Sequence, residues 1–128
     1  MIQINIAVME CLGDKMKRIL YGKEFNLTDL SLSGYNGLIF DLISAIEFMH
    51  LAISEGALIL GGDIIIKNED GEYIVGYDNW SSDSKNPQET FICALEYLKD
   101  YLTKNPLVNW RVSVVSSNIS ELLASSND

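Results

Sequence analysis

Residues 57–81 read ALILGGDIIIKNEDGEYIVGYDNWS, and this stretch decides the fold. Two runs rich in β-branched and aromatic residues, 63–67 and 72–77, flank the tetrapeptide Asn68-Glu69-Asp70-Gly71. Because a tight turn needs residues that tolerate positive φ, Asp-Gly between two such runs predicts a β-hairpin. Within its second strand we expect Tyr73, Val75 and Tyr77 to share one face, because side chains alternate along a strand.

A polar loop and a helix are predicted after the hairpin. Residues 78–86 read as the loop, with Trp80 as its one large apolar side chain. Asn86 is a typical cap, Pro87 suits the first helical position, and Glu89 stands where a capping box places its acid. The expected inward stripe of this helix is Phe91, Leu95, Leu98, Tyr101 and Leu102, and Asn105-Pro106 ends it.

Other elements are predicted on both sides of this region. Residues 38–53 are apolar nearly all round at helical spacing, which is typical of a central helix, with Asn36 as its cap and Gly56 at its end. Residues 6–21 favour a first helix, although the alternation at 2–6 also allows a short strand. Residues 22–37 read as irregular connection, and 110–115 as a last strand.

These elements predict an α+β fold with a small, mainly antiparallel sheet. The hairpin and the C-terminal strand form the sheet, and about three helices pack with it. We expect a single domain over residues 1–128, in which 118–128 form a frayed tail or a weak final helix.

The acidic charge is concentrated in the middle of the chain. The 128 residues include 18 acidic and 9 basic side chains, and the formal net charge is −9. Between Asp41 and Asp100 there are 12 acidic and 3 basic residues, so this part carries the whole net charge. The surplus of acids excludes a duplex nucleic-acid partner, which needs Lys and Arg against its phosphates. It favours a positively charged protein.

Five of these acids fall on the predicted turn and on the loop after the second strand. They are Glu69, Asp70, Glu72, Asp78 and Asp83. One interpretation is a solvated face that keeps the protein soluble. The other is a landing site for a basic partner, with Trp80 or a tyrosine as the apolar anchor.

The residues that enzymes use are scarce in this sequence. His50 is the single histidine and lies in the most apolar helix, and no nucleophile elbow, zinc-protease motif or phosphate loop occurs. We therefore predict no catalytic residues, no metal site and no cofactor. Cys11 and Cys93 read as free thiols of a reducing cytoplasm, although one disulfide between them is possible. The absence of a basic start or a bilayer-spanning run favours the cytoplasm and gives no membrane partner.

Two short strings carry a resemblance to a known family. Residues 59–63 (ILGGD) and 77–80 (YDNW), between an apolar helix and a capped amphipathic helix, resemble the immunity protein 40 family (Imm40) of bacterial polymorphic toxin and contact-dependent inhibition systems. The resemblance runs from about Phe25 to Val115, and residues 1–23 have no counterpart. It implies a small cytoplasmic α+β protein, without catalysis, that neutralises the C-terminal domain of one cognate toxin. Because such toxins are often nucleases with basic sites, an acidic inhibitor would complement their field.

Site residues are predicted in two groups. The first is a structural motif of Gly61, Gly62, Asp63 and Asn79, in which Asp63 either accepts hydrogen bonds from the segment carrying Asn79 or contacts the toxin directly. The second is the toxin-binding set. Its members are Glu69, Asp70, Glu72, Asp78, Trp80 and Asp83, and for Trp80 a structural role is the alternative.

Two other functions remain open from the sequence. A carboxylate-based, metal-dependent hydrolase could use Asp63 and Asp78. A small acidic adaptor could bind a basic protein other than a toxin. The oligomeric state is not fixed by the sequence, and a monomer is favoured.

Overall fold

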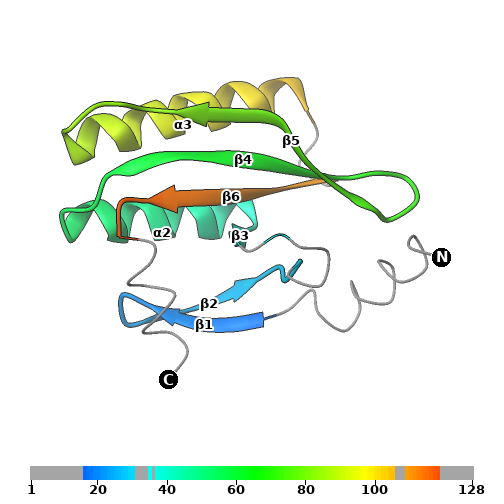
Figure 1. The fold of residues 1–128 in the computed structure, drawn as a ribbon, viewed down its shortest axis with the longest axis horizontal. Coiled ribbons are helices and arrows are strands. Elements are labelled where there is room, and N and C mark those ends of the chain that lie inside the picture. The colour runs from blue at the N-terminus through cyan, green and yellow to red at the C-terminus, as the bar shows by residue number, and fades with distance from the viewer. Residues whose placement is uncertain (1–15, 31–34, 36, 106–108, 119–128) are drawn as a thin grey trace.

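The fold is known from a computed structural model, which describes residues 16–30, 35, 37–105 and 109–118 (Figure 1). Six strands and two helices follow one another in this part of the chain. They are β1 (Met16–Leu20), β2 (Lys23–Leu27), β3 (Leu38–Phe40), α2 (Leu42–Ser54), β4 (Ile59–Lys67), β5 (Tyr73–Ser81), α3 (Pro87–Lys104) and β6 (Trp110–Ser116). The α+β class is confirmed, but about three helices overcounts the two that the described residues form.

A four-stranded antiparallel sheet organises the molecule. Its strand order is β3-β6-β4-β5, and β1 and β2 form a separate antiparallel hairpin. Both helices lie behind the sheet in the view of Figure 1. The main core fills the space between this sheet face and the helices, with Phe40, Phe48 and Val112 completely buried in it. A smaller cluster of Leu30, Ile39 and Ile65 lies apart from it.

The predicted hairpin is confirmed as β4 and β5. Asn68 organises its turn: the backbone N–H of Asn68 donates to the Glu72 carbonyl, and its side-chain Oδ1 accepts from the N–H groups of Asp70 and Glu72. Gly71 takes the positive φ (83°) that the turn requires. Tyr73 and Val75 both pack on the smaller cluster, as expected for one face, while the side chain of Tyr77 lies outside the described part.

The helix after the hairpin is also confirmed, with its cap. Asn86 Oδ1 accepts from the Glu89 N–H at 3.1 Å, and Pro87 opens the helix. The Glu89 carboxylate accepts from the Ser84 hydroxyl at 2.7 Å, so this acid braces the entry to the helix. Leu98 is buried as predicted, but Leu102 is 40% exposed and lies outside the inward stripe.

The helix predicted over 38–53 is in fact a strand followed by a shorter helix. Leu38, Ile39 and Phe40 form β3 and pair with β6, where tertiary pairing overrides the helical spacing. Asp41 caps α2 by accepting from the Ser44 N–H at 2.8 Å, so the expectation that Asn36 caps this helix is wrong.

Gly56 ends α2, as predicted. Its φ is 86°, its N–H donates to the Ile53 carbonyl, and the next N–H, of Ala57, donates to Ala52. This pair of bonds is a Schellman motif, which needs a residue in the left-handed region.

The expectations for the N-terminal part are largely wrong where the structure describes it. Met16–Leu20 is strand β1 instead of the end of a helix, and residues 1–15 lie outside the described part. Lys23–Leu27, predicted as irregular, is strand β2, and it buries Phe25 and Leu27 against the core. Tyr21 and Gly22 join the two strands, both with positive φ.

The predicted polar loop is shorter than expected. Strand β5 continues through Asp78, Asn79 and Trp80 to Ser81, so only residues 82–86 connect it to α3. The C-terminal strand is confirmed as β6, with Trp110, Val112 and Val114 buried. The predicted frayed tail or final helix at 118–128 lies, apart from residue 118, outside the described part of the chain.

Candidate functional site

The two glycines of the ILGGD string leave space for Trp80 and for neighbouring backbone. Gly62 is paired with Trp80 on β5 and with Val114 on β6. A Cβ atom on Gly62 would lie 2.2 Å from the Ser113 carbonyl oxygen and 2.4 Å from the Trp80 ring. One on Gly61 would lie 2.3 Å from the Trp80 carbonyl oxygen. Three strands therefore approach one another closely at the two glycines of the predicted structural motif, and both positions require glycine.

Trp80 and Asp78 point toward α3. The Trp80 side chain is 8% exposed, and its ring stacks on Tyr97 at 5.2 Å between centroids. The Tyr101 hydroxyl donates to Asp78 Oδ2 at 3.2 Å. Burial, and then the charge of Asp78, raise the pKa of Tyr101 to about 12. These contacts hold the edge strand β5 against the helix, and the burial of Trp80 supports its structural role.

Asp63 occupies the opposite face of the sheet. Its register partners are Asn79 on β5 and Ser113 on β6. The Tyr35 hydroxyl lies 3.1 Å from Asp63 Oδ2 and 2.7 Å from Ser113 Oγ. Burial raises the pKa of Tyr35, and the charge of Asp63 raises it further, so the phenol keeps its proton and donates to the carboxylate. The hydrogen bond that Asp63 accepts thus comes from Tyr35, whereas the sequence pointed to the segment carrying Asn79.

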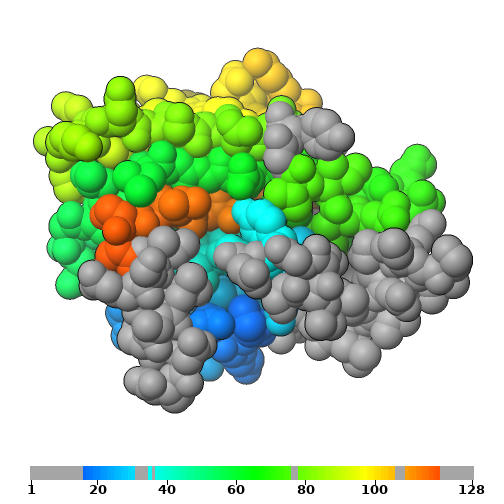
Figure 2. Space-filling model, in the orientation of Figure 1, coloured from blue at the N-terminus to red at the C-terminus, as the bar shows by residue number. Residues whose placement is uncertain are grey.

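A shallow pocket of about 300 Å³ opens beside Asp63. Its lining comes from both motif strings and from β6. The lining residues are Leu60, Gly61, Gly62, Asp63, Asn79, Trp80 and Val115. Leu60 and Val115 are 39% and 37% exposed, so the pocket has an apolar rim. Figure 2 looks onto the sheet from the side away from the helices, where β6 in orange and β4 and β5 in green form neighbouring bands.

The five acids of the predicted cluster are spread over the length of β5. Glu69 and Asp70 are exposed on the turn, Glu72 follows them, and Asp83 is exposed beyond the other end of the strand. With a rise of about 3.3 Å per residue, the strand separates Glu72 from Asp83 by about 30 Å. These acids are therefore distributed along β5 and at its two ends. Contact of these residues with a partner stays a prediction.

A profile of the immunity protein 40 family matches residues 29–115, which is more than half of the chain and includes both motif strings. The chain belongs to the immunity protein 40 family. Membership implies a cognate toxin that the protein neutralises, and proteins of such families are typically not enzymes. No curated protein and no solved structure gives a significant match to the chain.

The geometry of this immunity protein separates the two carboxylates of the hydrolase hypothesis. Asp63 on β4 is paired with Asn79 on β5, and Asp78 is the residue next to Asn79. Because neighbouring residues of a strand point to opposite faces of the sheet, the side chains of Asp63 and Asp78 lie on opposite faces. One contacts Tyr35 and the other Tyr101 of α3, so they cannot share a metal ion. Among the described residues, no group of three or more His, Cys, Asp or Glu side chains is arranged to hold a metal.

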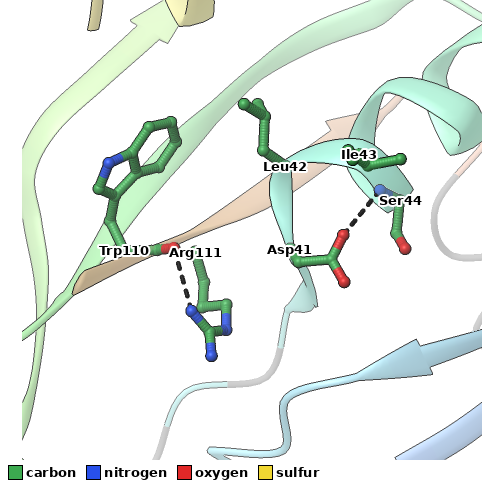
Figure 3. Close-up of a pocket in the computed structure, with 6 residues that line it drawn as sticks. All are labelled: Asp41, Leu42, Ile43, Ser44, Trp110 and Arg111. Carbon is green, nitrogen blue, oxygen red and sulfur yellow. Dashed lines mark hydrogen bonds between the residues drawn. The ribbon is translucent and has the colours of Figure 1, made fainter. Parts of the chain in front are cut away.

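Two other pockets flank α2. The first lies at its N-terminus and is lined by Asp41, Leu42, Ile43, Ser44, Trp110 and Arg111 (Figure 3). In this pocket the Asp41 carboxylate accepts a hydrogen bond from the Ser44 backbone N–H, and the Arg111 guanidinium donates to the Trp110 carbonyl. The second lies between α2 and α3, where the exposed His50 stands 6.0 Å from the Phe91 ring. Neither pocket contains a residue of the motif strings.

Several residues of the site could not be found from local sequence. Tyr35 lies 28 positions before Asp63 and 78 positions before Ser113. The strand register places Ser113 beside Asp63, and Tyr35 reaches both from outside the strands. The strand prediction for 110–115 was sufficient to place Ser113 and Val115 on the same face, but not to place that face beside Asp63.

Over the described residues, no helix is both long and apolar enough to span a membrane.

Proposed function

We propose that this immunity protein neutralises its toxin by binding a basic surface on the toxin domain, with electrostatic attraction and steric occlusion of the toxin's active site. The observation that carries the proposal is the charge of residues 41–100, which hold the entire net charge of −9. A toxin that acts on nucleic acid needs a cationic site for phosphates. We therefore propose a nuclease as the toxin class.

The hairpin turn is the proposed landing site. Glu69 and Asp70 are exposed at the tip of the β4–β5 hairpin, on a turn that Asn68 holds in place with three side-chain hydrogen bonds. Charges on a projecting turn steer a diffusing partner and increase the rate of association. Glu72, Asp78 and Asp83 extend the negative potential along β5. We expect the complex to form one-to-one in the cytoplasm, with this protein as a monomer.

Co-expression tests this proposal. The toxin domain encoded beside the gene of this protein is expressed with and without it in the same host. We expect growth arrest by the toxin alone, restored growth when both are expressed, and a one-to-one complex on a sizing column. Continued arrest without a complex would contradict the proposal. Recovery of a different basic protein as the stable partner would favour the adaptor function.

A further inference from the structure

Asp63 is a carboxylate without a cationic partner in the described part of the chain. The ion pairs described there are Lys23–Glu47 and Lys104–Asp100. Arg111, two positions along β6 from Ser113, donates to the Trp110 carbonyl instead. The neutral Tyr35 hydroxyl is the hydrogen-bond donor that Asp63 has. A partly buried carboxylate with one neutral donor retains capacity for a charge-assisted bond.

The pocket beside Asp63 has the shape and polarity of a receptor for a long basic side chain. Leu60 and Val115 form the apolar rim and can pack on a methylene stem, while the carboxylate can pair with the charged head. About 300 Å³ is ample for one arginine or lysine side chain. Gly61 adds no side chain to fill the space.

We propose that this pocket receives an arginine or lysine side chain of the cognate toxin, with Asp63 as its partner. This inference rests on the proposed function and makes it specific: the turn of the hairpin attracts the toxin, and the Asp63 pocket anchors it. The charge is complementary, because an unpaired carboxylate in an acidic protein takes a cation. Interface energy is typically concentrated in a few such anchors that fill pockets and are surrounded by contacts that exclude water.

The first test replaces the charge and keeps the shape. Asp63→Asn retains an oxygen that can accept from Tyr35, and Asp100→Asn removes the same charge from an exposed position of α3, on the other side of the sheet. Binding of the co-encoded toxin domain is measured by calorimetry, and thermal unfolding is measured for each variant. We expect Asp63→Asn to weaken binding by about 30-fold or more and to leave the unfolding temperature unchanged or higher. We expect Asp100→Asn to change affinity by less than about threefold.

The second test blocks the rim without touching the buried groups. Val115→Lys places a cation of this chain beside Asp63, and Ile92→Lys makes the same change at a residue of α3 that is 51% exposed. We expect the first variant to lose affinity by about 30-fold or more and the second to bind as the wild type does. A scan of the toxin's Arg and Lys residues should find one whose replacement has little further effect in the Asp63→Asn background.

The outcomes separate this inference from the function on which it rests. If the wild-type protein does not bind the toxin domain, the proposed function fails. If it binds, but Asp63→Asn and Val115→Lys retain wild-type affinity, the pocket is not the anchor and the inference is overturned. A large loss of stability in Asp63→Asn, with unchanged affinity of the folded fraction, would assign Asp63 a structural role and would also overturn it.

Discussion

Gly62 is the residue at which three strands come closest. Its hydrogen atoms face the Ser113 carbonyl and the Trp80 ring, where a methyl group would lie 2.2 Å and 2.4 Å from its neighbours. Backbone and a stacked indole cannot both retreat, so we expect Gly62→Ala to lower the free energy of unfolding by about 3 kcal/mol or more. Urea unfolding measures the change.

Gly56→Ala is the matched control for this substitution. Gly56 has a positive φ, which Gly62 does not, and no atom lies within 4 Å of its missing Cβ, so only the backbone strain of about 1 kcal/mol applies there. An effect at Gly62 no larger than the effect at Gly56 would show that the close contacts at Gly62 cost no more than about 1 kcal/mol, which contradicts the prediction.

Trp80 fills the space that the glycines leave. It is 8% exposed and stacks on Tyr97, so we expect Trp80→Ala to cost about 3–5 kcal/mol of stability. The indole Nε1 has no hydrogen-bond partner among the described residues, which makes this buried N–H unfavourable. Trp80→Phe keeps a ring and removes the N–H, and should cost less than half as much in the same urea assay. Loss of toxin affinity in Trp80→Phe at full stability would instead make Trp80 a contact residue.

At the scale of elements, α3 is fastened to the edge strand by Tyr101 and Asp78. The pKa of Tyr101 is about 12 in the folded protein, chiefly through burial and then through Asp78, against an ordinary value near 10. The folded state therefore holds this proton more tightly than the unfolded chain. Stability is retained below pH 10 and decreases as the pH rises toward 12, because the unfolded chain loses the proton first.

Tyr101→Phe tests this linkage. We expect the wild-type free energy of unfolding to fall between pH 10 and pH 11.5, and the variant to show a shallower fall. Tyr35 and Tyr97 also have raised pKa values, mainly through burial, so part of the fall should persist. Urea unfolding at several pH values gives both slopes, and parallel curves would count against the role of Tyr101.

The caps of the helices illustrate what local sequence can and cannot reveal. Asn86, Pro87 and Glu89 marked the start of α3 because capping depends on residues a few positions apart. Asp41 was missed as the cap of α2, because Leu38, Ile39 and Phe40 have apolar spacing that suits a helix equally well. Their pairing with β6, some 74 residues later, makes them a strand. The β1–β2 hairpin was missed for the same reason, since its two short strands depend on packing against the core.

On the scale of the whole molecule, the net charge was readable from the sequence but its arrangement was not. Counting residues placed the charge between Asp41 and Asp100. The extension of β5 to Ser81, which separates the turn acids from Asp83, required the sheet. The partner of Asp63 was likewise hidden, because Tyr35 reaches it across the sheet from a connecting segment.

Charge reversal at the turn tests the landing site. Glu69→Lys with Asp70→Lys alters two exposed side chains of the turn, and we expect this change to affect the association rate far more than the stability. The association rate with the toxin domain should fall about tenfold or more at low salt, and less at high salt, where screening weakens the attraction. Stopped-flow fluorescence measures the association rate at low and at high salt. An unchanged rate would place the landing site elsewhere on the protein.

The most direct measurement of the central claim is the binding of this immunity protein to its co-encoded toxin domain, with the affinity and the association rate both measured at low and at physiological ionic strength. We expect a tight one-to-one complex, faster to form at low salt, whose formation abolishes toxin activity in the same tube. A toxin that stays active at saturating concentrations of this protein, or a complex whose association rate is indifferent to salt, would contradict neutralisation through an acidic surface.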